Sequence, residues 1–598
     1  MKVFGLDFGT TNSVASMVVG TRCISLLDDN MPHPSIVCYQ GDEVIVGKKA
    51  KAMLGSAGAG GVGNIVRSPK TRLGEKSVEV DGFSYSPKEV VRDVVKHVCA
   101  DAKRQMPENM FATAVVTIPV DMNGSRRREL REACRLAGVS VMQFVHEPLA
   151  ALYGHLRNKE NYAEETRRLN GEIVLVFDWG GGTLDLTLCR MLGGMLVQIK
   201  NDGCDSVGGD LLDDMLVNYI EQAVLAKRGI THEVATQVGA KARLRASAEK
   251  AKVELSGKDT HPILVTDYFT NEAGDPDLEF RLTRHQLEAC IKQKIEQGIR
   301  RIEKILESSR LPASAVKLCL ATGGMVNMPC IQSRLREIFG AQRVEISTRG
   351  NTIISEGAAW IAHDGARLML SKNIEFLVAR QAYFPAIKAG TLMPSESTVQ
   401  THTLDMYCVD PTDGIAKFQI VAPERPGRSI QSTDERKTLG TLAVGVDEKV
   451  WPLGERLCID LSIDDNLILL VEVESTIARR KDRLEIHELE FGLAAPFDIE
   501  DISSAASRIK DVLTSLPKSE KGAIILRSNV SEDAQDTSRI PGEIARQLFG
   551  GEYFDRNSNR NLSLVQDYEK LAYQPCSCCR QVQCLCGALR KAGWTSPK

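Results

Sequence analysis

The chain has 598 residues, of which 43% are hydrophobic and 26% charged, so its composition is that of a folded globular protein rather than a disordered or fibrous one. This length exceeds what one hydrophobic core can stabilise, and at roughly 150 residues per domain about four compact units are expected. The 75 lysine and arginine residues nearly balance the 78 aspartate and glutamate residues. The chain therefore has no strong net positive charge that would attract it to nucleic acid or to an anionic membrane.

The N-terminal sequence, MKVFGLDFG, runs directly into an apolar strand pattern. The sequence shows neither the apolar stretch and cleavage site of a signal peptide nor a membrane-spanning run, so a cytoplasmic location without membrane insertion is expected. Most of the sixteen cysteines are scattered singly along the chain, as expected of reduced thiols rather than a disulfide framework.

From residue 1 to about residue 364, short aliphatic strands alternate with helical patterns, which predicts an α/β fold. Two strand-turn-strand segments of similar chemistry, VFGLDFGTTNSVASMV and IVLVFDWGGGTLDLTLC, lie about 170 residues apart. This repetition predicts a duplicated α/β lobe with a cleft between the two copies.

Beyond residue 372 the pattern changes to alternating strands, among them RLCIDLSI and LILLVEVE, which an Asp/Asn turn joins. Alternation with period two predicts an antiparallel β-sandwich over residues 379–494. Three later segments, SSAASRIKDVLTSL, SRIPGEIARQLFG and LSLVQDYEKLAYQ, predict a short, mostly helical region at 495–575, and a Cys-rich tail follows at 576–598.

The turn after the first strand has the composition of a phosphate site. A glycine in residues 9–11 lets backbone amides approach a ligand, with two hydroxyls beside it, and residues 180–183 repeat this design with three glycines. Asp7 and Asp178 would repel polyphosphate unless a divalent cation lay between them, so the pattern predicts Mg²⁺ together with nucleotide. A tight glycine turn would explain either hairpin alone, but the pair favours a nucleotide site.

Seven signatures occur in order along this region: GLDFGTTNS, HEPLAALYG, VFDWGGGTLDLTL, VGGDLLDD, AEKAKVELS, ATGGMVNMP and SEGAAW. In these motifs the chain resembles the seventy-kilodalton heat-shock chaperone family, as a divergent bacterial-type member, over its first 364 residues. The resemblance implies an actin-like (ribonuclease H-like) two-lobed ATPase domain at 1–364, an interdomain linker at 365–378 and a peptide-binding β-sandwich at 379–494.

The resemblance also implies roles for individual residues. Lys70 would stabilise charge developing on the γ-phosphate, and it forms the implied catalytic set with Glu147, Asp7, Asp178 and Thr183. Asp7, Glu147 and Asp178 would order the magnesium shell, and Asp185 would help to bind K⁺. The implied nucleotide contacts are Gly9, Thr10, Thr11, Gly180, Gly181, Gly182, Thr183, Gly208, Gly209, Glu249, Lys252, Ser256, Gly323, Gly324 and Asn327.

The residues that would contact adenosine differ more from the family pattern than the residues that would contact phosphate. Glu249, Lys252 and Ser256 share one helix face by their spacing, which is also what the polar side of an ordinary amphipathic helix would show. Asn327 stands where the family usually has an arginine, and Asn351 replaces a usual aspartate. Adenine selectivity therefore does not follow from the sequence.

Sugar kinases and actin-like filament proteins share such hairpins, but the downstream sandwich favours a chaperone. We therefore hypothesise an ATP-dependent chaperone that binds unfolded polypeptide, with J-domain and nucleotide-exchange co-chaperones as implied partners and no nucleic acid. The segment ARLMLSKNIEFLVARQ has the leucines of the family's linker without its acidic residues, which leaves interdomain coupling open. The alternative is an ATP-gated interaction or assembly protein for a dedicated partner polypeptide.

Five thiols are crowded near the C-terminus. When deprotonated, four of them would suffice for a tetrahedral Zn²⁺ site. Their spacing is not that of a paired CxxC ribbon, so reduced thiols without a metal are the alternative. The five residues are Cys576, Cys578, Cys579, Cys584 and Cys586.

Overall fold

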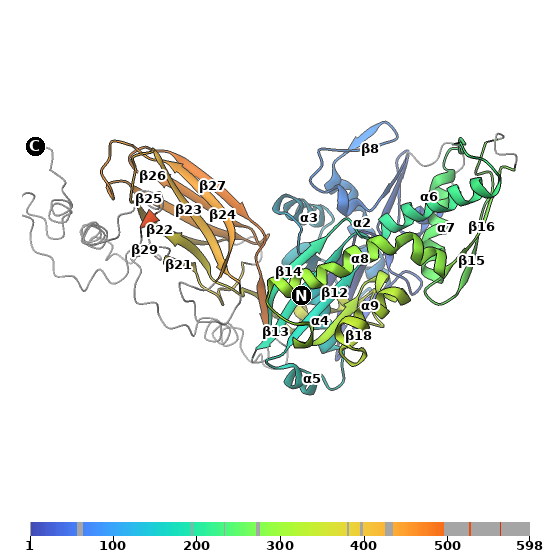
Figure 1. The fold of residues 1–598 in the computed structure, drawn as a ribbon, viewed down its shortest axis with the longest axis horizontal. Helices are drawn as coiled ribbons and strands as arrows, with labels where there is room; N and C mark the ends of the chain where they lie inside the picture. The colour runs from blue at the N-terminus through green and yellow to red at the C-terminus, as the bar shows by residue number, and fades with distance from the viewer. Residues whose placement is uncertain are drawn as a thin grey trace, which may run out of the picture. The chain divides into compact units, whose positions relative to one another are not determined.

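A computed structural model of the protein describes residues 2–56, 64–192, 195–232, 234–270, 275–378, 382–394, 399–424, 435–494, 525–527 and 562–563. Its elements are labelled in Figure 1. The chain forms two compact units, of which the first comprises residues 1–367 with a short return that begins at Leu493, and the second begins at Leu368. No helix among the described residues combines the length and the apolar character that crossing a bilayer requires.

The first half of unit 1 is built on a sheet with the strand order β11-β10-β1-β2-β3, and β4 lies beside β2. Strand β1 pairs in parallel with β10 and antiparallel with β2. The strands are β1 (Phe4–Phe8), β2 (Asn12–Val19), β3 (Arg22–Leu26), β4 (His33–Pro34), β10 (Thr113–Ile118) and β11 (Ser140–His146).

The second half of unit 1 repeats this arrangement with the strand order β18-β17-β12-β13-β14. Strand β12 pairs in parallel with β17 and antiparallel with β13, as β1 does with β10 and β2. The strands are β12 (Ile173–Trp179), β13 (Leu184–Leu192), β14 (Met195–Cys204), β17 (Val316–Thr322) and β18 (Val344–Ile346). The shared order and directions agree with the predicted duplication of one α/β lobe.

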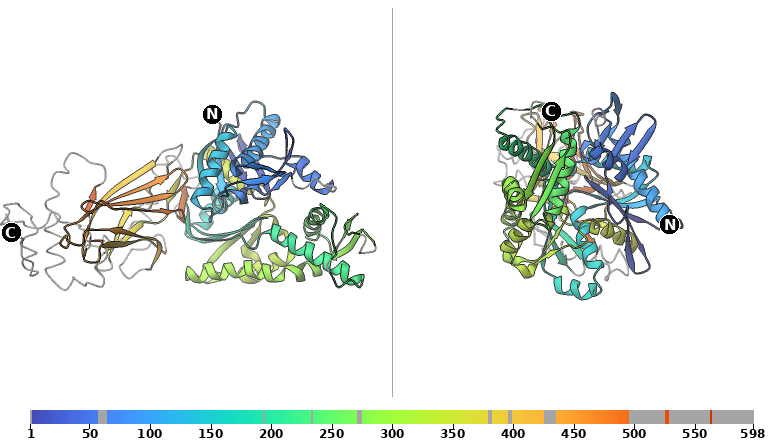
Figure 2. Two further views of the ribbon diagram at one scale, coloured as in Figure 1. Left: turned by 90° about the horizontal axis from the view of Figure 1, so that it is seen from above. Right: turned by 90° about the vertical axis from the view of Figure 1, so that its right-hand side faces the viewer.

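Smaller strands and helices complete both halves. In Figure 2 the blue N-terminal elements lie on one side of unit 1, and the green elements around α6 to α9 lie on the other. The small strands are β5 (Ile36–Gln40), β6 (Glu43–Val46), β7 (Ile65–Arg67), β8 (Val78–Val80), β9 (Phe83–Tyr85), β15 (Thr260–Val265) and β16 (Leu278–Thr283). The α-helices are α1 (Lys48–Ser56), α2 (Pro87–Gln105), α3 (Gly124–Leu136), α4 (Glu147–Arg157), α5 (Tyr162–Leu169), α6 (Gly209–Lys227), α7 (Ala240–Glu254), α8 (Arg284–Ser308), α9 (Pro329–Phe339) and α10 (Ile353–Asp364). Short 3₁₀ helices are η1 (Pro69–Arg72), η3 (Ala313–Ala315), η4 (Gly324–Asn327) and η5 (Ala341–Arg343).

Local sequence signals account for α8, a helix that packs against the second sheet. At the start of α8 the Thr283 side chain accepts a hydrogen bond from the Gln286 amide at 3.2 Å, and the Gln286 side chain accepts one from the Thr283 amide at 2.9 Å. This reciprocal cap satisfies amides that a helix start leaves unpaired. The apolar residues Leu287, Ile291 and Ile295 recur every fourth position and are buried, which anchors α8 against the sheet.

Helix α10 packs against the first sheet of unit 1 and against α4, where glycines allow close packing. A Cβ atom added at Gly357 would overlap the backbone carbonyl of Ala150 on α4, and one added at Gly5 on β1 would overlap the backbone of α10 itself. Because backbone atoms cannot move aside as a flexible side chain can, these contacts require glycine. They hold α10 firmly against both β1 and α4.

Unit 2 contains two antiparallel sheets, ordered β21-β20-β23-β24 and β27-β26-β25-β22, with β29 and β30 beside β22. Its buried residues alternate along the strands, as on Leu457, Ile459, Leu461 and Ile463 of β25, which is the pattern of a sandwich. The strands are β19 (Leu368–Leu370), β20 (Ile374–Val378), β21 (Ala382–Ile387), β22 (Val399–Cys408), β23 (Ile415–Pro423), β24 (Arg436–Gly445), β25 (Arg456–Asp464), β26 (Leu469–Ser475), β27 (Lys481–Ile486), β29 (Ile525–Arg527) and β30 (Leu562–Ser563). The chain returns from unit 2 to unit 1 within β28 (Phe491–Ala494), between Gly492 and Leu493.

Two predicted ranges contain strands. Within the range 365–378 predicted as a linker, residues 368–370 and 374–378 are strands, and the Leu368 carbonyl accepts a hydrogen bond from the Met393 amide at 2.8 Å. The third predicted helix is wrong at its start, because Leu562 and Ser563 pair antiparallel with β22. Most of 495–575 and all five zinc-candidate cysteines lie outside the described residues.

Candidate functional site

The two glycine hairpins of unit 1 face each other. In β1 and β2, Asp7 pairs with Val14, and in β12 and β13, Asp178 pairs with Asp185, so each hairpin places a carboxylate just before its turn. A Cβ atom at Gly182 would overlap the side chain of Thr10, which lies on the opposite hairpin. This close approach brings backbone amides and hydroxyls from both halves of the unit to one cavity.

The cavity brings together most of the residues that the sequence singles out. Its lining includes Asp7, Gly9, Thr10, Thr11, Lys70, Glu147, Asp178, Gly180, Gly181, Gly182, Thr183, Gly209, Glu249, Lys252, Ser256, Gly323 and Gly324. Three predicted residues do not line it. Gly208 lies behind the second hairpin, Asp185 accepts a hydrogen bond from the Val120 amide at 3.1 Å, and Asn327 donates to the Gly324 carbonyl at 3.2 Å.

Sequence reasoning missed several lining residues. Asp210 and Asp213 both face the cavity from α6, and Asp213 forms a 2.7 Å ion pair with Lys252. They belong to the VGGDLLDD signature, and their i, i+3 spacing on a helix was a usable signal. Four further lining residues also lie within quoted signatures: Asn12, Val253, Met325 and Met328. Pro32, Gly350 and Ile354 carry no local signal and reach the cavity through tertiary structure.

The acidic end of the cavity is buried and carries excess negative charge. Burial, reinforced by Glu147, raises the pKa of Asp7 to about 7, although Lys70 and a hydrogen bond from Thr117 oppose this. Burial and Glu147 also raise the pKa of Asp178 above its ordinary value. Asp185, which pairs with Asp178 but does not itself line the cavity, has its pKa raised to about 8 by burial, Glu147 and Asp121. A site of this kind gains stability from an added cation.

Lys70 is the cation that the structure places among these carboxylates. It lies in η1, with its side chain only 4% exposed, and its Nζ is 2.6 Å from Glu147 Oε1. Arg126 supports this turn by donating a hydrogen bond to the Lys70 carbonyl at 3.1 Å. A buried ammonium group held in this way is preorganised to meet negative charge in the cavity.

The carboxylate oxygens suit a hard divalent cation. Within the described ranges, no group of three or more His, Cys, Asp and Glu side chains is arranged to hold a metal ion by itself. The buried Asp185 Oδ2 has no hydrogen-bond partner there, which leaves an acceptor available for a cation or water. Mg²⁺ usually keeps several waters and takes one or two carboxylates together with phosphate oxygens, so this donor set fits Mg²⁺ bound together with a nucleotide.

An ion pair joins the two halves of unit 1 at the other end of the cavity. Lys51 on α1 lies 2.7 Å from Glu249 on α7, and Glu249 lines the cavity. Burial tends to raise the pKa of Glu249, but the pair with Lys51 outweighs this and holds it below its ordinary value. The pair is therefore a direct link between α1 in the first half of unit 1 and α7 in the second, beside the cavity.

Replacing Lys51 by alanine is expected to speed nucleotide release by about two- to fivefold, because one partly exposed ion pair between the two halves is lost. Stopped-flow dissociation of a fluorescent ADP analogue measures the rate. Lys49→Ala, which removes an exposed lysine from the same helix, is the matched control and is expected to release at the wild-type rate. Identical rates for both variants would contradict a role of the Lys51–Glu249 ion pair in retaining nucleotide.

The fold and the cavity define a two-lobed α/β protein with a glycine-lined, carboxylate-rich site between facing hairpins. The family model described as Hsp70 protein matches residues 64–364, about half of the chain. The chain belongs to the Hsp70 family.

Similar proteins carry chaperone names. The chain is 30% identical over 384 residues to the chaperone protein dnaK1 of Synechocystis, a match that covers 60% of this chain and 53% of the relative. It is 30% identical over 345 residues to the chaperone protein DnaK of Thermosipho melanesiensis, covering 57% and 55%. It is 28% identical over 361 residues to DnaK of Mycoplasma mycoides subsp. mycoides, covering 60% and 58%. The chain thus spans just over half the length of the curated relatives it matches.

Proposed function

We propose that this protein is an ATP-dependent molecular chaperone, in which Mg-ATP hydrolysis in an actin-like unit is coupled to binding and release of unfolded polypeptide by the sandwich. The observation that carries the proposal is the meeting of both glycine hairpins, the buried carboxylates and Lys70 at one cavity. Family membership and the names of the relatives support the same reading.

The hairpins supply the proposed phosphate grip. Backbone amides of residues 180–183 and the hydroxyls of Thr10 and Thr11 would bind the β- and γ-phosphates, since glycine turns present several amides to an anion. Thr11 Oγ1 is buried and has no hydrogen-bond partner among the described residues, so it is available to a ligand. Lys70 would stabilise the charge that develops as the γ-phosphate is transferred to water.

The carboxylates orient the cation that accompanies ATP. Asp7, Glu147 and Asp178 would hold Mg²⁺ through water, and the ion would neutralise charge on the phosphates. Asp185 would contribute to a K⁺ site. Glu147 also fixes the Lys70 ammonium group through the 2.6 Å ion pair, so one carboxylate positions both positive charges.

Residues on α7 and the turn after β17 would hold the nucleoside. Lys252 is fixed by Asp213 and by the Gly209 carbonyl, which it meets at 2.9 Å. Glu249 lies on α7 with Lys252, whereas Ser256 lies in the turn just beyond the helix, so the three residues do not share one helix face as expected from their spacing. All three line the cavity, as do Gly323 and Gly324. This arrangement would present polar side chains to ribose and glycine backbone to the base.

Hydrolysis of ATP by the purified full chain tests the proposal. We expect hydrolysis with Mg²⁺, none when EDTA removes it, and faster hydrolysis when a permanently unfolded polypeptide such as reduced, carboxymethylated lactalbumin is added. Absence of hydrolysis under all conditions would contradict the ATPase. A hydrolysis rate that does not change when unfolded polypeptide is added would instead favour the alternative of a dedicated partner.

A further inference from the structure

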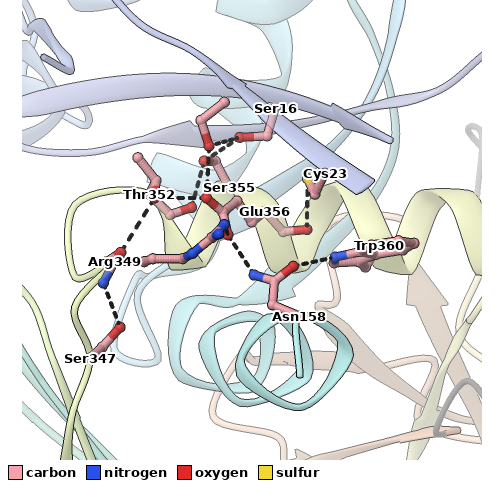
Figure 3. Close-up of polar contacts among 10 residues, drawn as sticks. Ser16, Cys23, Asn158, Ser347, Arg349, Thr352, Ser355, Glu356 and Trp360 are labelled. Atoms are coloured by element: carbon pink, nitrogen blue, oxygen red, sulfur yellow. Dashed lines mark hydrogen bonds and ion pairs between the residues drawn. The ribbon is translucent and has the colours of Figure 1, made fainter. Parts of the chain in front are cut away.

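A buried carboxylate in the first turn of α10 lies inside a quoted signature but has no role among those that the resemblance implies. Glu356 is 3% exposed and accepts four hydrogen bonds on its two oxygens. An ionised carboxylate at such depth is stable only when its lone pairs are satisfied by donors, and charged donors contribute most. Figure 3 shows this network around Glu356.

The donors on one side belong to the rigid core of unit 1. Ser25 Oγ on β3 donates to Oε1 at 2.9 Å, and the Asn158 side chain, just after α4, donates to Oε2. Asn158 is itself fixed by Trp360 Nε1, which donates to its Oδ1 at 2.8 Å. The α10 backbone is held by its glycine contacts with α4 and β1, so Glu356 is a fixed point.

The donors on the other side come from the loop between β18 and α10. Arg349 Nη1 donates to Oε2 at 3.0 Å, and Thr352 Oγ1 donates to Oε1 at 2.8 Å. The Arg349 carbonyl accepts hydrogen bonds from the Thr352 and Ile353 amides, both at 2.8 Å. The loop is therefore tied to the first turn of α10 through Arg349.

The two residues that follow Arg349 in this loop, Gly350 and Asn351, line the nucleotide cavity. Gly350 lies close to Gly323, because a Cβ atom at Gly350 would be 3.5 Å from both the amide nitrogen and the carbonyl oxygen of Gly323. Thr322 Oγ1 is 3.5 Å from the Gly350 carbonyl. The loop thus forms part of the cavity wall beside the turn after β17, where the nucleoside is expected.

We propose that Glu356 is a positioning residue for nucleotide binding, which holds Arg349 so that Gly350 and Asn351 face the nucleoside. This inference rests on the proposed ATP-binding function. A purely structural Glu356, serving the α10 helix dipole and core packing, would affect stability alone. Because Gly350 and Asn351 carry no charged side chain that could act on the γ-phosphate, Glu356 acts on affinity rather than on the chemical step.

Glu356→Gln keeps the shape of the side chain but removes its charge and presents an amide to donors on Asn158 and Arg349. We expect ATP and ADP to bind about tenfold more weakly, the effect of losing one hydrogen bond to a charged group. The kcat at saturating ATP should stay within about twofold of wild type. Isothermal titration with each nucleotide and steady-state hydrolysis by the full chain provide both values.

Ser25→Ala is the matched control, because it removes a donor to the same carboxylate that comes from β3 and not from the loop. It should lower the melting temperature without weakening nucleotide binding beyond about twofold. Arg349→Ala removes the loop's own contact at a side chain that is 54% exposed, so folding is not at risk, and it should weaken binding as Glu356→Gln does. The double variant should be no weaker than either single variant.

Wild-type nucleotide affinity for Arg349→Ala would overturn the positioning role, whatever Glu356→Gln does to folding. Equal loss of affinity in Ser25→Ala and Glu356→Gln would also overturn it, since the effect would then be general destabilisation. Failure of the wild-type chain to bind ATP or ADP is a separate result and would contradict the proposed function itself.

Discussion

Replacement of Lys70 by alanine is expected to slow ATP hydrolysis by about a hundred- to a thousandfold, the effect of removing one preorganised charge from a transition-state site. Its ammonium group is buried beside Glu147 and faces the cavity with both hairpins. Affinity for ADP should change by about threefold or less, because the charge that Lys70 stabilises develops only during phosphate transfer. Single-turnover hydrolysis and ADP titration measure the two effects.

The control for this variant is Lys49→Ala, which removes an exposed lysine from the same half of the unit. It should hydrolyse ATP at the wild-type rate. A Lys70→Ala protein that hydrolyses ATP within about threefold of wild type would remove Lys70 from the mechanism. Loss of ADP affinity as large as the loss of rate would make Lys70 a binding residue instead.

Replacement of Gly208 by alanine is expected to weaken nucleotide binding by about a hundredfold, because the added methyl group has no room and must displace the phosphate turn. A Cβ atom there would overlap the backbone carbonyls of both Gly181 and Gly182. Those two residues line the cavity, so their amides would be pushed out of position. Equilibrium titration with ATP, together with a thermal melt, separates the loss of affinity from a loss of folding.

Gly257→Ala is the matched control, since a Cβ atom at this exposed position meets nothing within 4 Å. Its nucleotide affinity should equal that of wild type. If Gly208→Ala binds ATP as tightly as Gly257→Ala, the turn at residues 180–183 either yields freely or does not bind phosphate. Either outcome would contradict the rigid phosphate grip.

Much of the site could be predicted from sequence because its chemistry is concentrated in short motifs. The glycines and hydroxyls of each hairpin are contiguous, and a turn that exposes amides is a local property. The resemblance to the family added Lys70 and Glu147, which are 77 residues apart in sequence yet 2.6 Å apart in space. No spacing rule would have joined them.

The remaining features depend on tertiary contacts. Pro32 and Ile354 line the cavity through the packing of β4 and α10, and Glu356 lies inside a quoted signature without a pattern that marks it as a network centre. Likewise, Leu562 and Ser563 looked helical, whereas pairing with β22 makes them a strand. The secondary structure of a short segment depends more on the strand with which it pairs than on its own propensity.

The sequence predicted that this region is a β-sandwich, but it did not predict which of its side chains are buried in the core. The alternating pattern gives the strands, yet it does not distinguish a side chain that binds peptide from one that fills the core. Phe384 and Ile387 are each 1% exposed and belong to the core. Tyr383 is covered by the Arg436 guanidinium, 3.9 Å from its ring centroid. These three side chains are therefore not a ready peptide surface.

The measurement that tests the central claim most directly is the dissociation rate of a fluorescent unfolded peptide from the full chain with Mg²⁺ and either ATP or ADP. Coupled units predict much faster release in ATP, because closure around nucleotide changes the grip of the sandwich. Equal rates in ATP and ADP, or no peptide binding at all, would contradict a chaperone mechanism in which nucleotide state controls polypeptide release.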